Sequence, residues 1–314
     1  MTEAESPSSD GSQLEAVHAQ SNLRAPGGPP PVSIGMFVYN GEKYLRSTLD
    51  ALLAQTFADF ELIISDNASS DGTEAICREY AAADRRIAYI RHPSNIGPAA
   101  NAKFVLEKAR GEYFMWAACD DTHSLDFIEV NYEFLVQNPD YVASTCPTGF
   151  EGDDPIARKF VDFELDGEVF ERFTTFFRYC WVSHGIFYSL VRTDTLRSCE
   201  IVGDVFLAID WAINLFLASR GKIHRTQRGY TIFGVGGVSR GIGVYKTSRV
   251  SSVEFFWPFY RLGRYCATIT TSFTLQQKLR LAVILLKLNL VANYSRLRAE
   301  IQQYSIRYAG PKVR

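Results

Sequence analysis

Short apolar runs alternate with amphipathic stretches in the first half of the chain. The runs at 32–38, 60–65, 87–91 and 112–119 have the length and the β-branched and aromatic content of buried strands. Between the first two runs, leucines repeat at helical spacing over residues 45–53 and would bury one face of a helix. Strands that alternate with helices form a parallel sheet, so the pattern predicts an α/β fold with a mainly parallel central sheet flanked by helices.

Polar residues mark where the next helices begin. Asp71, followed three residues later by Glu74, has the spacing of a capping box that would start a helix. Pro98 directly after Gly97 has the position of a first helical residue. Because capping already explains Asp71, we do not expect it to take part in catalysis.

The second half of the chain is less regular. Its pattern predicts a helix at 167–180, a strand at 185–192 and a helix at 204–219. From residue 205 to residue 218 every residue is apolar except Asp210 and Asn214, which are four apart and share a stripe. A helix that is apolar on nearly all sides is expected to be buried.

A carboxylate inside such a helix is costly unless it is paired or used in chemistry. Burial raises the pKa of a carboxyl group, which makes Asp210 a candidate for a general base. The alternative is a structural aspartate in a salt bridge with an arginine such as Arg178 or Arg240. The residues alone leave both interpretations open.

The two ends of the chain differ from its body. Residues 1–31 are rich in Ser, Pro, Gly and Ala and lack the basic and apolar regions of a signal peptide, so we expect a disordered tail. Residues 253–314 hold 10 Lys/Arg against 2 Asp/Glu, whereas the rest holds 23 against 33. The apolar run at 281–292 is too short to span a bilayer. This basic, aromatic-rich helical region, 251–314, either lies on an anionic membrane surface or packs against the body.

The length and the cysteine content limit the number of domains and the cellular compartment that we expect. A chain of 314 residues can bury a sizeable core as one large or two modest domains. The six cysteines are scattered, and neither they nor the histidines have the spacing of a zinc site. Free thiols fit a reducing cytosol, so we expect a cytoplasmic protein, peripheral to the inner face of the membrane if its terminal region binds lipid. Nucleic acid is not expected as a partner.

Polar residues follow four consecutive predicted strands. In parallel sheets ligands bind at the carboxyl ends of the strands, so these residues are expected to share one edge. Asp120 and Asp121 end the fourth strand, where two adjacent carboxylates repel each other unless a cation, a sugar hydroxyl or solvent takes up the charge. A solvated turn is the alternative for an isolated pair. The residues concerned are Tyr39-Asn40, Asp66-Asn67, His92 to Asn95, and Asp120-Asp121.

A glycine-rich segment at 234–246 carries two cations. Its glycines let the backbone approach a ligand closely, and Arg240 and Lys246 could neutralise a diphosphate leaving group. The segment matches neither the phosphate-loop nor the dinucleotide-binding motif. A surface loop without a ligand is the alternative.

These residues resemble successive signatures of family 2 glycosyltransferases. The order and spacing of four blocks carry the resemblance, which covers residues 32–130 strongly. Ile-Asp-Trp at 209–211 and Gly-Gly-Val-Ser at 236–239 resemble later segments of the family more weakly. The four blocks are Val-Ser-Ile-Gly-Met-Phe-Val-Tyr-Asn at 32–40, Asp-Asn-Ala-Ser-Ser-Asp-Gly-Thr at 66–73, Asn-Ile-Gly at 95–97 and Gly-Glu-Tyr-Phe-Met-Trp-Ala-Ala-Cys-Asp-Asp at 111–121.

The resemblance implies a GT-A fold and an inverting, hexosyltransferase-type enzyme. Its donor would be a nucleoside-diphosphate sugar, and its acceptor a saccharide or lipid-linked saccharide of surface polysaccharide assembly. It also implies a division of the chain into a GT-A domain at 32–250, with a nucleotide-binding half at 32–130 and an acceptor-binding half at 131–250.

The resemblance also implies roles for individual residues. Tyr39 would stack on the base and Asp66 would accept a hydrogen bond from it, with Asn95 also on the donor side. Asp120 would contact the ribose. Asp121 would ligate a divalent cation, Mg²⁺ or Mn²⁺, and Asp210 would deprotonate the acceptor hydroxyl.

The chain also departs from the family pattern. Ala118 stands where many members have the first aspartate of Asp-x-Asp-Asp, so the metal site depends on Asp121. Ile209 replaces the usual glutamate before the base, which leaves Asp204 as an alternative to Asp210. His184 and Trp181 are candidates for the acceptor side, because aromatic faces stack on sugar rings, and core packing is the alternative for the aromatic stretch.

The sequence is also compatible with two other functions. A catalytically silent sugar-nucleotide binder, or a scaffold of a glycan assembly complex, would bind the donor without turnover. A nucleotidyltransferase would also use a carboxylate-bound metal, but it would want a glycine- and lysine-rich loop after the first strand, which residues 39–42 do not supply.

Overall fold

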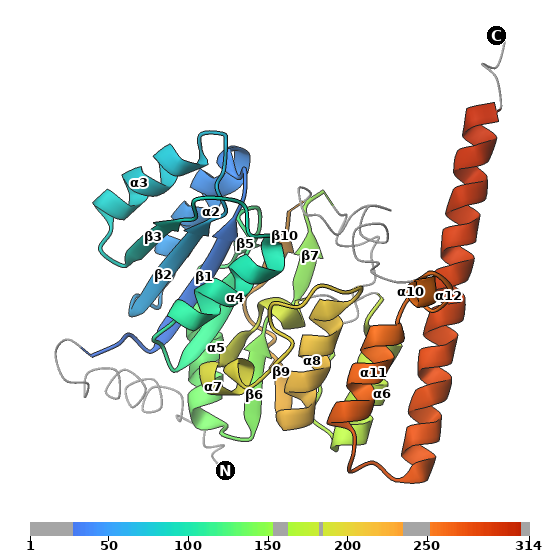
Figure 1. Ribbon diagram of the computed structural model, residues 1–314. Helices are drawn as coiled ribbons and strands as arrows, with labels where there is room; N and C mark the ends of the chain where they lie inside the picture. Colours follow the sequence, from blue (N-terminus) through green and yellow to red (C-terminus); the bar gives the residue numbers. More distant parts are fainter. Residues whose placement is uncertain (1–27, 153–162, 182–184, 235–251, 309–314) are drawn as a thin grey trace, which may run out of the picture.

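The computed structural model describes residues 28–152, 163–181, 185–234 and 252–308, with side chains up to residue 298. Figure 1 labels the elements. The strands are β1 (Val32–Val38), β2 (Phe60–Asp66), β3 (Ile87–Arg91), β4 (Tyr113–Ala117), β5 (Thr122–His123), β6 (Tyr141–Thr145), β7 (Thr148–Phe150), β8 (Leu190–Arg192), β9 (Lys222–Arg225) and β10 (Thr231–Phe233). The helices are α2 (Glu42–Leu53), α3 (Thr73–Ala83), α4 (Pro98–Lys108), α5 (Phe127–Gln137), α6 (Val169–Tyr179), the 3₁₀ helix η1 (Ile186–Tyr188), α7 (Thr193–Arg197), α8 (Ile209–Arg220), α10 (Ser252–Phe256), α11 (Tyr260–Ile269) and α12 (Leu275–Tyr308).

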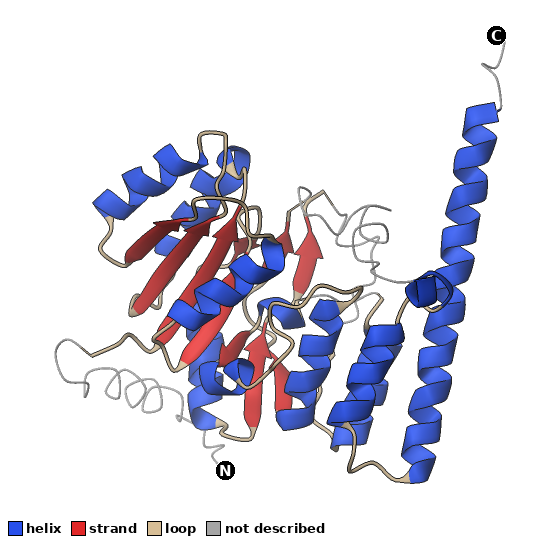
Figure 2. Cartoon of the chain, viewed as in Figure 1, coloured by secondary structure: helices blue, strands red, loops and turns tan. Residues whose placement is uncertain are grey.

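A seven-stranded sheet in the order β3-β2-β1-β4-β8-β6-β9 forms the centre of the molecule (Figure 2). All neighbouring strands are parallel except β8, which runs antiparallel to β4 and to β6. The predicted α/β fold with a mainly parallel sheet is confirmed. The expected boundary at residue 130 falls inside α5, and strands from both sides of it belong to this one sheet.

Alternation along β4 separates the two faces of the sheet. Tyr113 and Met115 pack into a core shared with α2, α3 and α5, whereas Phe114 and Trp116 pack into a second core shared with α4, α6, α8, α11 and α12. Because successive side chains of a strand point to opposite faces, one strand serves both cores. The result is a sheet covered by helices on both sides.

A smaller sheet, in the order β5-β10-β7, is built from segments that lie far apart in the sequence. Its strand β5 begins immediately after Asp121, and β10 pairs with it antiparallel. The end of β10 at Phe233 therefore returns the chain to the carboxyl end of β4.

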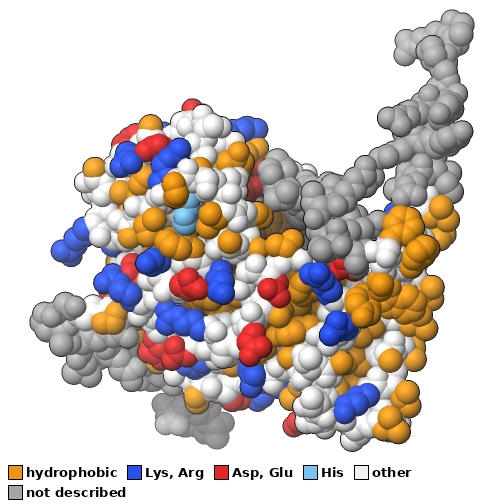
Figure 3. All heavy atoms as spheres, viewed as in Figure 1, with side chains coloured by type: hydrophobic (Ala, Val, Ile, Leu, Met, Phe, Trp, Pro, Cys, Tyr) orange, Lys and Arg blue, Asp and Glu red, His pale blue; other side chains and the backbone are white. Residues whose placement is uncertain are grey.

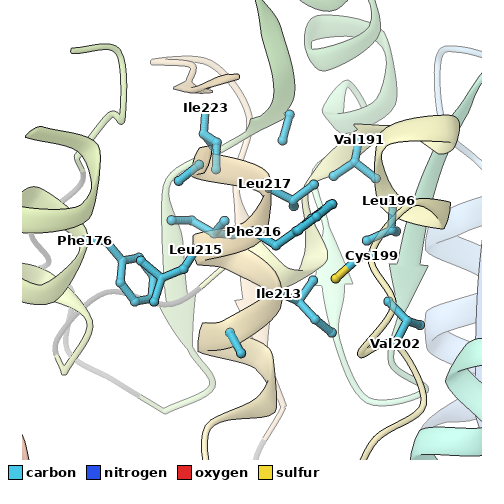
Figure 4. Packing of buried hydrophobic residues seen from close by; sticks show 14 of the residues in the cluster. Phe176, Val191, Leu196, Cys199, Val202, Ile213, Leu215, Phe216, Leu217 and Ile223 are labelled. Carbon is cyan, nitrogen blue, oxygen red and sulfur yellow. The ribbon is translucent and has the colours of Figure 1, made fainter. Parts of the chain in front are cut away.

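Helix α8 is buried, as its apolar sequence predicts. Every residue from 212 to 218 is buried, and the side chains of Leu215 and Phe216 lie among residues of α6, β8 and α7 (Figure 4). The predicted start of this helix at residue 204 is wrong, because Ala208 adopts a left-handed conformation with φ 62° and the helix begins only at Ile209. Asp204 lies outside the helix and is exposed.

Two further predictions of local structure are wrong. The stretch 185–192 is a strand only over its last three residues, because Gly185 at φ 103° turns the chain into η1 first. The helix predicted to start with a capping box at Asp71 has Gly72 as its N-cap, with no side-chain cap. The Asp71 carboxylate instead accepts hydrogen bonds from the backbone N–H groups of Thr73 and Glu42, so it ties together the starts of α2 and α3.

The C-terminal region is helical, as expected. Helix α12 has 34 residues, which corresponds to about 50 Å at 1.5 Å per residue. Figure 1 shows it at the edge of the molecule beside α11 and α6, with its last turns projecting beyond the body. None of the helices in the described ranges combines the length and hydropathy needed to cross a bilayer.

Candidate functional site

The carboxyl ends of β1, β2, β3 and β4 meet at one edge of the sheet. Val38 at the end of β1 pairs with Asp66 at the end of β2, and Asp66 pairs with Arg91 at the end of β3. Met36 pairs with Ala117, which ends β4 three residues before Asp120. The polar residues that follow these strands therefore share one edge, as the sequence predicts.

Asp66 is fully buried and held by three groups. Its Oδ1 accepts a hydrogen bond from the backbone N–H of Ser69 at 2.8 Å, and its Oδ2 accepts from the hydroxyl of Tyr89 at 2.8 Å and from the guanidinium of Arg91 at 2.7 Å. Burial alone would raise the pKa of this carboxyl, but the hydrogen bonds from Ser69, Tyr89 and Arg91 outweigh it and lower the pKa. Asp66 is therefore ionised and already fully partnered.

The loop after β1 is tied to the loop after β2. The Asn40 backbone N–H donates to the Ser69 hydroxyl at 2.9 Å, and the Asn40 side-chain oxygen accepts from the Ser70 backbone N–H at 2.8 Å. Asn40 itself has φ 52° and Ala68 has φ 62°, both in the left-handed region. Among the described residues, only one other non-glycine position has a positive φ, and it is Ala208, two residues before Asp210. Unfavourable backbone conformations of this kind concentrate at functional sites.

Asn95 fixes the start of α4. Its side-chain oxygen accepts hydrogen bonds from the Asn67 amide and from the Gly97 backbone N–H, both at 2.9 Å. The Asn67 side-chain oxygen accepts from the backbone N–H of Ile96 in return. Tyr39, by contrast, is 51% exposed, so one face of its ring is available to a ligand.

Asp120 and Asp121 lie against the end of β10. The Asp121 Oδ1 atom accepts a hydrogen bond from the backbone N–H of Gly234 at 3.0 Å. A Cβ atom at Gly234 would meet the Asp120 carbonyl oxygen at 2.3 Å and its carboxylate Oδ2 at 2.6 Å, so only glycine fits here. The backbone carbonyl of Cys119 accepts from the Thr48 hydroxyl at 2.8 Å, which holds the segment from the α2 side.

The Asp120–Asp121 pair leaves buried oxygen atoms without partners. The Oδ2 atoms of Asp120 and Asp121 are buried and accept no hydrogen bond from the described residues. Burial and the neighbouring charge of Asp120 raise the pKa of Asp121 to about 7, and the Gly234 N–H only partly offsets them. Such a carboxyl group is half protonated at neutral pH unless a positive charge is close to it.

A divalent cation fits these two carboxylates. Mg²⁺ is commonly held by one or two carboxylates together with substrate phosphates and water. Within the described part of the chain, no cluster of three or more His, Cys, Asp or Glu side chains is suited to a metal. The candidate ligand atoms at this edge are therefore the unpartnered Oδ2 atoms of Asp121 and Asp120.

Asp210 lies in the first turn of α8. It is half-buried and forms no salt bridge with a described residue, Arg178 included, whereas the other expected partner, Arg240, lies outside the described residues. Burial raises its pKa, while a hydrogen bond from the backbone N–H of Trp211 lowers it by less. Helix α8 ends at Arg220, just before the parallel strand β9, so its first turn lies toward the carboxyl ends of the strands.

Tyr188 of η1 lies beside the end of β10. Burial raises its pKa, and the negative charges of Asp121, Asp210 and Asp120 raise it further. The Tyr188 ring lies beside that of Phe233, at 5.6 Å between centroids, and Phe233 precedes Gly234, whose backbone N–H binds Asp121. Phe187, the residue before Tyr188, stacks on Trp116 of β4 at 4.5 Å between ring centroids, which fixes η1 on the sheet.

Trp181 belongs to an aromatic cluster next to Asp210. Its ring meets that of Trp211 edge to face at 5.1 Å, and Trp211 stacks on Phe259 at 5.5 Å. Trp181 is 42% exposed, so part of its ring remains open to a ligand. His184, Arg240 and Lys246 lie outside the described residues.

Sequence reasoning missed two residues of this arrangement. Tyr188 lies in a stretch that the pattern assigns to a strand, and no motif marks it. Gly234 was expected to bring the backbone close to a ligand, whereas it brings the backbone close to Asp120 and Asp121. The sequence feature that could have pointed to Gly234 is its position at the start of the glycine-rich segment, 113 residues after Asp121.

Solved structures show the same fold at low sequence identity. The chain superposes on Staphylococcus aureus TarS 1-349 in complex with UDP-GlcNAc with a TM-score of 0.58, at 19% identity over 75% of this chain and 66% of that chain. A mannosyltransferase, PcManGT from Pyrobaculum calidifontis, in complex with GDP-Man and Mn²⁺, gives 0.53 at 16% identity and covers 95% of both chains. The fold is that of GT-A glycosyltransferases.

The sequence profile of Glycosyl transferase family 2 matches residues 33–191, half of the chain, and the chain belongs to that family. An "Uncharacterized glycosyltransferase" of Haemophilus influenzae is 37% identical over 109 residues, 35% of this chain and 44% of that protein. A "Putative teichuronic acid biosynthesis glycosyltransferase TuaG" of Bacillus subtilis is 32% identical over 123 residues, 39% of this chain and 46% of that protein. The matched segments span less than half of these relatives.

Proposed function

We propose that this chain transfers a hexosyl group from a nucleoside-diphosphate sugar to an acceptor hydroxyl, with inversion at the anomeric carbon. The observation that carries the proposal is that Asp120 and Asp121, after β4, and Asp210, in the first turn of α8, all lie toward the carboxyl edge of the central sheet. One carboxylate pair has buried oxygen atoms without partners, and a third carboxylate with a raised pKa lies on a separate helix. This separation matches the two needs of the reaction, a charge acceptor for the leaving group and a base for the nucleophile.

Asp210 is the proposed base. It removes the proton of the acceptor hydroxyl as that oxygen attacks the anomeric carbon. The bond from the anomeric carbon to the diphosphate oxygen breaks, and its electron pair leaves with the nucleoside diphosphate. Inversion follows because the base and the leaving group lie on opposite faces of the sugar.

Asp121, with Asp120, would hold the divalent cation. When bound, the cation neutralises the charge that grows on the leaving diphosphate. The PcManGT complex with GDP-Man and Mn²⁺, a structure of the same fold, supports a divalent cation. Arg240 would add a positive charge at the diphosphate.

The strand-end loops form the proposed donor-binding side. Tyr39 would stack on the base, and Asn95 would shape the loop beside it. Asp66 would accept a hydrogen bond from the base. The base can reach this buried carboxylate only if Tyr89 or Arg91 moves away from it. The complex of TarS with UDP-GlcNAc supports a nucleotide-sugar donor.

Trp181 and His184 are the proposed acceptor contacts. The exposed part of the Trp181 ring suits a sugar face, and the ring lies next to the residue after Asp210. Similarity to TuaG supports an acceptor in surface polysaccharide assembly.

A donor screen tests the proposal. Thermal shifts of the chain are measured with UDP-, GDP- and dTDP-sugars, with and without Mn²⁺, and transfer or hydrolysis of a labelled donor is then followed. We expect a stabilising shift that depends on Mn²⁺, accompanied by turnover. A silent binder would give the shift without turnover, and the absence of a shift with every donor would contradict the proposed donor class.

A further inference from the structure

The outer face of α12 is apolar although it is exposed. Apart from Val291, its exposed apolar residues recur at steps of three or four, so they form one stripe along the helix. Figure 3 shows hydrophobic side chains gathered along the edge of the molecule where α12 lies. The stripe, called the outer stripe below, consists of Leu275, Leu279, Val283, Leu286, Leu290, Tyr294 and Leu297.

The opposite face of the same helix is already covered. Leu281, Leu288 and Ala292 are buried in the core that also contains α6 and α11. Packing against the body, which was one of the two expectations for this region, therefore accounts for one face of α12 and leaves the outer stripe exposed.

Aromatic residues at the end of α10 and directly after it lie beside this helix and are called the aromatic group of α10. Phe255, Phe256 and Trp257 are all exposed, and Phe256 is 70% exposed. The Asn293 side chain donates to the Phe256 carbonyl at 2.9 Å, and the Arg296 guanidinium donates to the Phe255 carbonyl at 2.7 Å. The aromatic group is therefore fixed to α12 and has a defined orientation.

The charge around the stripe has a single sign. Between Glu254 and Glu300 the sequence contains seven Lys/Arg and no Asp/Glu. Arg280, Lys287 and Arg298 are seven and eleven residues apart, so they share one side of the helix and flank the outer stripe. A helix with an apolar face, basic flanks and aromatic neighbours is suited to the interface of an anionic bilayer.

Pairing with a second copy of the chain fits this surface poorly. Two outer stripes packed together would bring the flanks of both helices side by side. Those flanks are basic, and residues 255–299 contain no carboxylate to pair with them. The charge pattern therefore favours an anionic lipid surface over self-association.

We propose that the outer stripe of α12 and the aromatic group of α10 dock this protein on an anionic lipid surface. The helix lies in the plane of the interface, with Arg280, Lys287 and Arg298 at the headgroups. Trp257 lies two residues before Phe259, whose ring stacks on Trp211 of α8, so the docking surface is connected to the first turn of α8. The proposal is independent of the glycosyltransferase reaction.

Vesicle co-sedimentation of the full chain tests the proposal, with neutral phosphatidylcholine vesicles and vesicles that contain phosphatidylglycerol. We expect binding to the anionic vesicles that falls as salt rises. L290Q should weaken it roughly fivefold, because a leucine side chain is lost from the interface. L125Q is the matched control, since Leu125 is 55% exposed against 58% for Leu290 and lies outside the docking surface. It should change binding less than twofold.

R280Q/K287Q/R298Q separates charge from apolar contact. It should weaken binding to anionic vesicles by roughly tenfold or more and leave binding to neutral vesicles nearly unchanged. Equal binding by wild type to neutral and anionic vesicles, or no binding to either, would overturn the proposal. So would a dimer in sedimentation velocity that L290Q dissociates while vesicle binding stays the same, because the stripe would then belong to a second copy.

Discussion

Two regions at the same edge of the sheet shift the pKa of a buried carboxyl group in opposite directions. On the donor-binding side, Asp66 is fully buried, yet three hydrogen bonds lower its pKa. The proposed reaction side consists of Asp120, Asp121 and Asp210. There, Asp121 is 4% exposed and accepts a hydrogen bond from a single described donor, the Gly234 N–H, and its pKa rises to about 7. Both side chains are almost inaccessible to solvent, so hydrogen-bond donors and neighbouring charges decide the direction of the pKa shift: Arg91 lowers the pKa of Asp66, whereas Asp120 raises that of Asp121.

The difference agrees with the separate roles proposed for the two regions. The donor-side loops are satisfied internally, through Asn40 to Ser69 and Asn67 to Asn95, and so can present a preformed surface. The reaction side keeps unsatisfied charge at Asp121 and a raised pKa at Asp210, both of which a substrate or cation would relieve. Buried charge that destabilises the free protein and is compensated when a ligand binds is typical of an active site.

The largest expected effect is on turnover. D210N keeps the shape of the side chain but cannot accept the acceptor proton, so we expect turnover to fall roughly 10³-fold while donor binding is retained. D204N is the matched control, because Asp204 is exposed and outside α8. It should stay within about twofold of wild type. Single-turnover assays with labelled donor measure both, and a larger loss in D204N than in D210N would move the base to residue 204.

The same substitution in the two regions should change stability in opposite directions. D66N removes the charge that Arg91 and Tyr89 bind and turns an amide toward donors, so we expect a loss of roughly 3 kcal/mol in the free energy of unfolding. D121N removes a charge that is buried without sufficient partners. The rise in the pKa of Asp121 from 3.8 to about 7 limits the gain at neutral pH to about 4 kcal/mol.

Urea unfolding at pH 7.5 without divalent cation measures both variants. The comparison between the regions fails if D66N and D121N shift the midpoint in the same direction. In wild type, Asp121 favours folding fully below about pH 4, and this contribution is lost as pH rises through 7. D121N should remove that part of the pH dependence.

Cation affinity should depend on pH through the same group. Protons compete with the cation for Asp121, so the affinity for Mn²⁺ should fall about tenfold per unit below pH 7 and level off above it. Isothermal titration calorimetry between pH 5.5 and 8.5 gives the slope. A constant affinity across this range would mean that Asp121 does not bind the cation.

The sequence predicts the first half of the fold closely, because buried strands are marked by short apolar runs. The predicted strands 32–38 and 87–91 have the observed bounds. The start of α8 could not be predicted, since 205–208 is as apolar as the helix and the left-handed turn at Ala208 has no mark in composition. Hydrophobicity reports burial, and it does not report where a helix can begin.

The candidate site, too, could be predicted from the sequence only in part. Strand order places Tyr39, Asp66 and Asp121 at one edge before any coordinates are known. Sequence does not show how many donors each carboxylate receives, and this number separates Asp66 from Asp121. Contacts over long sequence separations, such as Gly234 with Asp121, depend on the tertiary fold and leave no local pattern.

The smallest expected effect concerns backbone conformation beside Asp210. Ala208 at φ 62° pays the cost of a left-handed conformation, and glycine does not. We therefore expect A208G to stabilise the protein by about 0.5 kcal/mol. Asn40, at φ 52° on the donor side, compensates through its bond to Ser70, so N40G should not gain stability. A54G is the matched control, because Ala54 has φ −85° and glycine there only adds freedom to the unfolded chain. If A208G destabilises the protein as A54G does, the conformation at residue 208 carries no strain, and the reaction side differs from the donor side in its charges alone.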